Sequence, residues 1–560
     1  MQNLIAFFIF QITSLGIFAL FSPLFKIECD KDKIGTSIFW GFWGAMLLTY
    51  LLALVMPTHL NLACYLIFLV SLFGIGRLVR EKIILDIFKS HYVYCLVFLL
   101  PFVFFLVHKP STCDEYGHWV LLPKIYIATN ELITGAITSG MGYTPLWTLQ
   151  AAFFEFFIPG SFSESVLAVI KMGIFVSFLF FLKETLKLKT LAFLVFAFLT
   201  LLLTAKFNKH LVIEFPIYIL ITSLTFLVYA LEKGEEKKLL YFIFMGTLSI
   251  YMVKKSMIAI LPSVIWYLWA KNYKKELFAF IFVFCFFVIS WKMKTYGKSE
   301  LLAPGHTINS FTSSDALLFY SKLVEKVKEN FIYFIAFAGS LYLMFRESWR
   351  LFVFYAMFSS IFITALLVSY LFSFHVYEAL KFASFVRYLT SVFYPAYLMA
   401  LYILVSKPSE KIEIQGEKLG RNGILFGFAL LSLIIGGFYV YQGYNESKRD
   451  YVGHLVSGIN PAHLSETGGV LILGPASTSY EYWRFKYHFY PCAQKMEFYP
   501  IEKLSYKNLQ DFLSQYNLII VRQTNEQLNQ LLKNHWEINP MEATQFYLYK
   551  KNNKVEFQKL

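Results

Sequence analysis

Two carboxylates and an imidazole stand close together in an otherwise apolar sequence. The stretch Cys113-Asp114-Glu115-Tyr116-Gly117-His118-Trp119 follows an apolar run, and Lys124 comes shortly after it. Carboxylate and imidazole groups are the side chains that most often act as general acids and bases. We therefore expect Asp114 and Glu115 to be catalytic, with His118 and Lys124 near the substrate. The alternative is a set of solvated loop residues without a chemical role.

A second stretch, Gly142-Tyr143-Thr144-Pro145-Leu146-Trp147, combines aromatic side chains with a turn. Aromatic faces pack against apolar faces of ligands, and Tyr143 would suit the wall of a sugar site. Tyr and Trp are also enriched where a helix meets the membrane surface. On these residues alone, the membrane-surface interpretation is the better one.

Cations interrupt three apolar runs. Lys254-Lys255 lies between Val253 and Ser256, Arg387 stands before Tyr388 at the head of a run, and Lys171 lies inside another. A charge in or beside hydrocarbon is costly unless it is paired or solvated, so it indicates function. Arg grips a phosphate with two hydrogen bonds. We expect Lys254, Lys255, Arg387 and Tyr388 to bind substrate, whereas Lys171 is better explained by snorkelling.

The composition identifies the class of protein that must hold these residues. Of 560 residues, 57% are hydrophobic and only 15% are charged, against about 25% in an ordinary soluble protein. A soluble enzyme, a disordered chain and a fibrous repeat are excluded, and a polytopic membrane protein remains. The net charge of +14 (50 basic minus 36 acidic residues) suits contact with anionic membrane lipids. The basic residues form no single stripe, so we predict no nucleic-acid partner.

Hydrophobic runs of roughly 20 residues predict membrane-spanning helices. We expect 12–14 of them, starting with Met1–Leu24, two in Gly35–Gly76 separated by the Pro57 turn, and Ile84–His108. Further spans are predicted near residues 165–182, 190–205, 215–231, 239–253, 256–270, 277–291, 331–345, 351–371, 388–406 and 423–441.

Clusters of Lys and Arg between the runs predict the orientation. One alternation places every such cluster in the cytoplasm, with the N-terminus and segments 109–162, 292–330, 372–387 and 442–560 outside an inner (plasma) membrane. The predicted domains are additional N-terminal helices at 1–83, a membrane core at 84–441 and a small extracytoplasmic α/β domain at 442–560. Strands near 470–475, 517–521 and 546–549, with a helix at 524–533, indicate the α/β fold.

The six cysteines are widely spaced and form no CxxC, so no zinc or redox motif is expected. The α/β segment carries no G-x-G-x-x-G, and a nucleotide fingerprint is therefore unsupported.

In its organisation over about residues 85–405, the sequence resembles the GT-C superfamily of integral-membrane glycosyltransferases. The resemblance is carried by the acidic pair Asp114-Glu115 opening a long outer loop, the later Tyr143-Thr144-Pro145 turn and the outer Arg387-Tyr388. It implies transfer of a sugar from a polyprenyl-phosphate carrier to an envelope lipid, glycan or protein acceptor at the outer face, usually with inversion.

The resemblance also implies roles for individual residues. Asp114 would be the general base or orient the acceptor, Glu115 would help to bind the acceptor or a divalent metal ion, and Arg387 would hold the donor phosphate. Two features depart from the family: three spans precede the core, and a single proline stands where relatives often have consecutive prolines. The sugar, the acceptor and any metal therefore stay open.

Two other functions fit the sequence. One is a polymerase or ligase of preassembled lipid-linked saccharides, which would need the same cations. The other is a transporter or flippase, for which internal repeats and midplane charges would be typical. No convincing repeat is present, and the charges lie at the predicted outer boundary.

Overall fold

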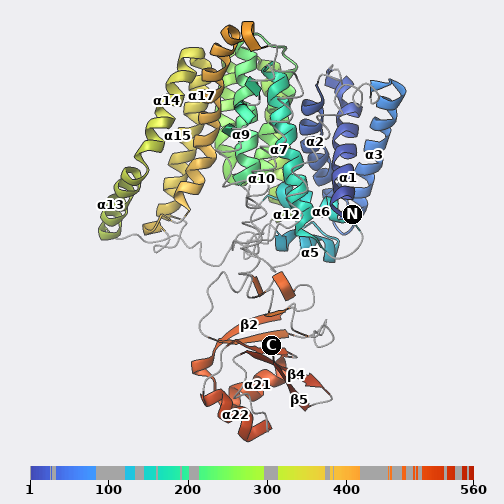
Figure 1. Cartoon of the computed structure of the whole chain (residues 1–560), viewed down its shortest axis with the longest axis vertical. Coiled ribbons are helices and arrows are strands. Elements are labelled where there is room, and N and C mark those ends of the chain that lie inside the picture. The colour runs from blue at the N-terminus through green and yellow to red at the C-terminus, as the bar shows by residue number, and fades with distance from the viewer. Residues whose placement is uncertain are drawn as a thin grey trace. The chain divides into compact units, whose positions relative to one another are not determined.

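The structure is a computed structural model of the chain, which divides into two compact units: Met1–His108 with Asn130–Tyr441, and Lys109–Thr129 with Gln442–Leu560 (Figure 1). The described residues are 2–25, 27, 33–83, 120–132, 144–158, 162–188, 192–193, 195–197, 199–200, 214–295, 313–372, 379–382, 384–416, 452, 455–456, 459, 469–474, 484–485, 487–489, 495–516, 518–522, 526–536, 545–551 and 554–559.

The first unit is a bundle of helices (Figure 1). Its α-helices are α1 (Gln2–Phe21), α2 (Ile34–Val55), α3 (Leu60–Arg80), α6 (Leu146–Glu155), α7 (Glu164–Thr185), α9 (Glu214–Glu232), α10 (Leu239–Val253), α11 (Leu261–Ala270), α12 (Lys274–Thr295), α13 (Ser313–Glu329), α14 (Phe331–Glu347), α15 (Trp349–Phe372) and α17 (Phe385–Gly416). Two 3-10 helices, η1 (Ser22–Phe25) and η6 (Lys255–Ile260), follow α1 and α10.

Eight helices in the described part of the chain are long and apolar enough to cross a membrane. They lie in Gln2–Leu24, Ile34–Val55, Leu60–Arg80, Glu164–Thr185, Glu214–Glu232, Lys274–Lys294, Trp349–Leu371 and Phe385–Ser406. A multi-pass membrane protein is thereby supported. Leu239–Val253 and Lys255–Ala270 are apolar but shorter helices, which is one reason why the count is below the predicted 12–14. The predicted spans at 84–108 and 423–441 and most of 190–205 lie outside the described residues.

Helix α1 packs closely against its neighbours because glycines stand at the crossings. A Cβ on Gly16 would lie 2.0 Å from the carbonyl oxygen of Ser71 in α3, and one on Gly41 of α2 would lie 1.9 Å from that of Ser14. Small residues at crossings let membrane helices approach each other and gain van der Waals contact. Helices α1, α2 and α3 therefore form a tightly packed group.

The bundle has two ends, which we name after the residues that bound α9. Helices α1, α7, α9 and α17 all begin at the Glu214 end: Asn3 accepts a hydrogen bond from Ser165 at 2.9 Å, and Arg387 pairs with Glu214. The start of α1 and helices α6 and α13 lie at the lower edge of the bundle in Figure 1.

Ion pairs connect the helices at the opposite, Glu232 end. Glu232 Oε1 lies 2.7 Å from Lys271 Nζ, and Glu232 Oε2 accepts a hydrogen bond from Ser348 and lies 3.6 Å from Arg350. Lys233 pairs with Glu347 at 2.9 Å. Several basic clusters that were predicted to share one side of the membrane thus lie at one end of the bundle.

The second unit is built on a five-stranded sheet of order β2-β1-β3-β4-β5. Strand β1 (Gly469–Gly474) runs parallel to both β2 (Lys495–Pro500) and β3 (Leu518–Val521). Strand β4 (Phe546–Lys551) runs antiparallel to both β3 and β5 (Lys554–Lys559). The predicted strands near 470–475, 517–521 and 546–549 are present. Strands β2 and β5 and helix α21 (Tyr506–Gln515) are additions to the prediction.

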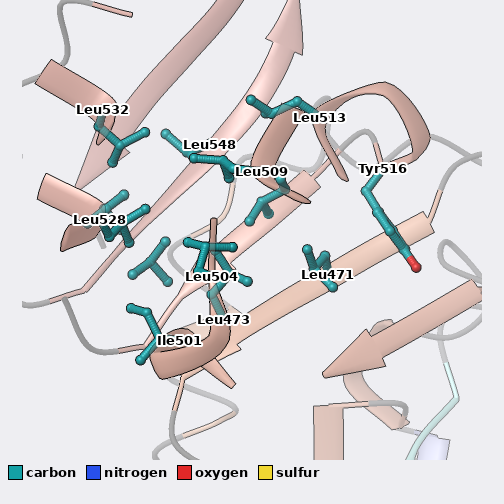
Figure 2. Packing of buried hydrophobic residues seen from close by; sticks show 13 residues of the cluster. Leu471, Leu473, Ile501, Leu504, Leu509, Leu513, Tyr516, Leu528, Leu532 and Leu548 are labelled. Atoms are coloured by element: carbon teal, nitrogen blue, oxygen red, sulfur yellow. The ribbon is translucent and has the colours of Figure 1, made fainter. Parts of the chain in front are cut away.

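Both faces of the central strands β1 and β3 are buried. Leu471 and Leu473 pack on one face with leucines of α21 and α22 (Glu526–Trp536), as Figure 2 shows. Val470 and Ile472, which alternate with them, pack on the other face with Phe485. Because successive strand side chains point to opposite faces, an uninterrupted apolar strand requires cover on both sides. This explains the uninterrupted apolar run of strand β1.

Segment 109–162 was predicted to be one polar outer loop of the membrane core, and the structure divides it differently. Helix α5 (Leu121–Thr129) belongs to the second unit, with Leu121, Leu122 and Ile125 buried. Helix α6 belongs to the first unit, and all ten of its residues are buried. The reason is composition, since both helices are too apolar to remain in water.

Candidate functional site

Helix α17 carries two of the predicted substrate-binding residues in its first turn. Arg387 Nε lies 3.3 Å from Glu214 Oε1 at the start of α9, and its guanidinium carbon lies 5.4 Å from the centre of the Tyr388 ring. Tyr388 itself is half-buried. The arginine therefore connects α17 with α9 at the Glu214 end.

Between α10 and η6 the helical backbone is interrupted at Lys254, and the side chain of Lys254 lies close to the same ring. Lys254 stands between α10 and η6 in an extended conformation, with φ −151° and ψ 115°. Its Nζ lies 4.5 Å from the centre of the Tyr388 ring, a distance typical of a cation–π contact. Lys254, Arg387 and Tyr388, which the sequence predicted as one site, are thus brought together. Lys255 follows as the first, exposed residue of η6.

Two buried charges extend this group. Glu214 is 2% exposed, and so is Lys171 of α7, whose Nζ lies 4.8 Å from the centre of the Phe215 ring. The snorkelling interpretation of Lys171 is wrong, because its amine packs between α7 and α9 inside the protein. Sequence reasoning missed Glu214, although an acid at the head of an apolar run was a usable signal.

We call this group the cationic cluster: Lys171, Glu214, Lys254 and Arg387, with the rings of Phe215 and Tyr388. Its three basic side chains and one acidic side chain give a formal charge of +2. Cationic side chains in partly buried surroundings attract an anionic ligand, because electrostatic attraction is less screened there than in water.

The predicted Tyr143-Thr144-Pro145 turn ends near the cationic cluster. Thr144 Oγ1 donates a 2.9 Å hydrogen bond to the carbonyl oxygen of Tyr251, three residues before Lys254. The Trp147 ring lies 6.0 Å from Phe215. Tyr143 itself, like Asp114, Glu115 and His118, lies outside the described residues. Of the predicted site residues, the cluster contains Lys254, Arg387 and Tyr388.

Lys124 lies in the second unit, whereas the cationic cluster lies in the first. Its Nζ donates a 3.0 Å hydrogen bond to the carbonyl oxygen of Tyr487 and stands 4.7 Å over the ring of the same residue. These contacts attach α5 to the rest of its own unit. The role of Lys124 in substrate binding stays a prediction.

A second polar group lies where α6 meets α7. Glu155 is 6% exposed, and its Oε1 accepts a hydrogen bond from the Ser163 amide at 3.2 Å. Ser163 and Ser165 are hydrogen-bonded at 2.8 Å. Glu155 is the last residue of α6, which is not among the candidate spans. Burial raises the pKa of the Glu155 carboxyl to about 8. This side chain is therefore protonated at neutral pH.

Within the described ranges, no three His, Cys, Asp or Glu side chains gather in a way that would hold a metal ion. The cationic cluster offers a single carboxylate, so its residues do not fit a divalent cation. The acids Asp114 and Glu115, for which the resemblance allows a metal ion, lie outside the described residues.

Comparison with known proteins returned no match to a family, to a curated protein or to a solved structure. We therefore take the function from the residues themselves.

Proposed function

We propose that this protein is a membrane-embedded glycosyltransferase that takes a sugar from a polyprenyl-phosphate carrier. One observation carries the proposal: Arg387 and Lys254, distant in the sequence, converge on Tyr388 at one end of a bundle of apolar helices. An anion-binding site at the end of such a bundle suits a ligand with a charged head and a hydrocarbon tail. The resemblance to the GT-C superfamily supports the same donor.

The physics of the donor explains why the site would lie there. Each methylene group that leaves an apolar environment costs about 0.8 kcal/mol, so a long prenyl tail stays in the bilayer. The enzyme must then bring its polar reaction centre to the membrane boundary. Helix α17 and the break after α10 do this for Arg387 and Lys254, while the buried Glu214 orients the guanidinium.

In the proposed reaction, an acceptor hydroxyl attacks the anomeric carbon of the sugar. The new bond joins that carbon to the acceptor oxygen, the bond to the phosphate oxygen breaks, and the polyprenyl phosphate leaves with the electron pair. Arg387 and Lys254 stabilise the charge that develops on the leaving phosphate. Asp114 takes the hydroxyl proton. Attack opposite the leaving group inverts the configuration.

Binding of the carrier separates this proposal from a nonspecific membrane role. The probe is a fluorescent polyprenyl phosphate, titrated onto the full-length protein in detergent. We expect Arg387→Ala and Lys254→Ala to weaken binding by tenfold or more, the size of loss that about 1.4 kcal/mol produces. Arg346→Ala removes an equal charge from an exposed position on α14 near the Glu232 end and is the matched control.

Asp114→Asn should abolish sugar transfer and leave carrier binding largely intact, because it removes only the proton acceptor. Unchanged binding in both Arg387→Ala and Lys254→Ala would refute the phosphate site. Turnover of an oligosaccharide carrier but not a monosaccharide carrier would favour the polymerase or ligase. Full activity of Asp114→Asn, together with loss of lipid movement in a midplane variant, would favour the transporter.

A further inference from the structure

An apolar groove of about 490 Å³ lies among helices α1, α2, α10 and α12 of the first unit. Its walls include Phe18 of α1, Gly44 and Leu47 of α2, Met245 of α10 and Phe284 of α12. Volumes of roughly 300–1,000 Å³ are typical of ligand pockets. The groove begins at the Glu232 end, where α1 ends and α10 starts, and is separate from the cationic cluster at the Glu214 end.

The groove opens to the side of the bundle. Val283 of α12 and Tyr241 of α10 line it and are 46% and 42% exposed. Three of its four walls are candidate spans, so a bilayer around these helices would bring hydrocarbon to its mouth. A hydrocarbon chain needs no hydrogen bond, and the polar atoms on these walls are few. A lipid chain is therefore the occupant that the surroundings supply.

The walls alone cannot select one lipid. A chain already surrounded by other chains gains little hydrophobic free energy on entering the groove, because lipid tails are as apolar as the walls. Any preference must come from the headgroup and from the charges that stand at the membrane surface. The Glu232 end carries such charges.

Lysines stand at the heads of three of the helices that form the groove. Lys33 precedes α2, Lys237 and Lys238 precede α10, and Lys274 and Lys275 begin α12. The acids Glu236 and Glu276 pair with Lys238 and Lys237, each at 2.5 Å. Glu184 accepts hydrogen bonds from the Gly35 and Thr36 amides at the head of α2, so five lysines and three glutamates leave a formal charge of +2.

The electrostatics place Lys33 with this group. The hydrogen bond from Lys238 lowers the pKa of the Glu236 carboxyl, and the charge of Lys33 lowers it further. Lys238 therefore pairs with this carboxylate, and Lys33 is near enough to act on it; Lys238 stands at the head of α10 and Lys33 at the head of α2. Both helices form walls of the groove.

We propose that this groove binds one acyl chain of an anionic glycerophospholipid, whose phosphate lies at Lys33 and Lys238. The site is independent of the proposed sugar transfer, because it lies at the opposite end of the bundle from Arg387. Basic residues near a membrane surface each contribute about 1 kcal/mol of attraction to anionic lipid. A bound phospholipid would fill the space among the four helices.

Gly44 provides a direct test. A Cβ at this position would lie 3.5 Å from Met245 Sδ, which is ordinary contact, so a larger side chain extends into the groove without displacing the backbone. The full-length protein is reconstituted in nanodiscs of equal phosphatidylglycerol and phosphatidylcholine and then extracted. Retained lipid is counted by native mass spectrometry. We expect wild type to retain phosphatidylglycerol and Gly44→Leu to lose it by roughly tenfold.

Gly339→Leu is the matched control, because Gly339 is exposed on α14 and a Cβ there meets nothing within 4 Å. A melting curve identifies Gly44→Leu protein that has failed to fold, and Gly44→Ala then gives a milder obstruction. Lys33→Gln with Lys238→Gln should keep a lipid but lose the preference for phosphatidylglycerol. The proposal would be overturned if Gly44→Leu and wild type retained equal amounts of phosphatidylglycerol, or if the double lysine variant kept the preference for it. Occupation of the groove by polyprenyl phosphate alone would overturn it as well.

Discussion

The pairing of Glu214 with Arg387 defines the proposed site at the residue scale. Glu214 is 2% exposed, and the Arg387 side chain is 28% exposed with its Nε at 3.3 Å. Removal of one partner from a buried pair leaves an uncompensated charge, which costs more than the pair contributes. The same arginine therefore has a structural role beside its proposed contact with phosphate, and an experiment must separate the two.

Arg387→Ala should lower the melting temperature, because it leaves the Glu214 carboxylate buried without its cation. The expected loss lies at the lower end of about 3–5 kcal/mol, since Arg387 is partly exposed. Arg387→Ala combined with Glu214→Gln should recover most of that stability but none of the carrier binding. A double variant no more stable than the single one would show that Glu214 does not depend on Arg387.

Glu155 predicts a pH dependence. Burial raises the pKa of its carboxyl from 4.5 to about 8, so between those values the folded protein holds a proton that the unfolded chain has lost. The stability that this group supports is complete below about pH 4.5 and is lost as the pH rises through about 8. Glu155→Gln should stabilise the protein at pH 8.5 and flatten its melting temperature over that window. A melting temperature of Glu155→Gln below that of wild type at pH 8.5 would contradict the raised pKa of Glu155.

The packing of α1 on α3 is the clearest requirement at the scale of the elements. A Cβ on Gly16 would meet the Ser71 carbonyl oxygen at 2.0 Å, and one on Gly74 would meet the Gly16 carbonyl oxygen at 1.9 Å. No side-chain rotation relieves a clash with backbone, so the two helices would have to separate.

Gly16→Ala should therefore destabilise the protein by about 1–3 kcal/mol, the range for overpacked cores. Gly76→Ala is the matched control on α3, because a Cβ there meets nothing within 4 Å. The control should be neutral or stabilising, since Ala favours a helix over Gly by about 1 kcal/mol. Melting curves in one detergent compare the two, and equal melting temperatures would contradict the close approach.

The sequence predicted best the elements that consist of an uncharged apolar run bounded by charged residues. Lys238 and Lys254 bracket an uncharged run, and the helix between them has the predicted bounds, 239–253. Strand β2 was missed because Lys495-Met496-Glu497-Phe498-Tyr499-Pro500 mixes charge with aromatic side chains. Glu214 was missed because its partner lies far along the chain. The acids Asp114 and Glu115 stay predictions.

At the scale of the whole molecule, the chain contributes to the second unit twice. Helix α5 belongs to that unit together with the C-terminal sheet, although long stretches of the bundle separate them in sequence. A nine-residue apolar segment can pack on either unit, so its composition could not predict which. One contact that joins α5 to the rest of its unit is the hydrogen bond from Lys124 to the Tyr487 carbonyl oxygen.

Lys124→Met preserves the length of the side chain and removes the ammonium group. Hydrogen bonds from charged groups contribute about 1.5–3 kcal/mol, so amide hydrogen exchange in β1 should accelerate while exchange in α9 is unchanged. Lys507→Met removes an exposed charge from α21 and is the matched control. Carrier binding should remain at the wild-type level in both variants. Loss of carrier binding in Lys124→Met alone, with unaltered exchange in β1, would support the predicted role of Lys124 in substrate binding.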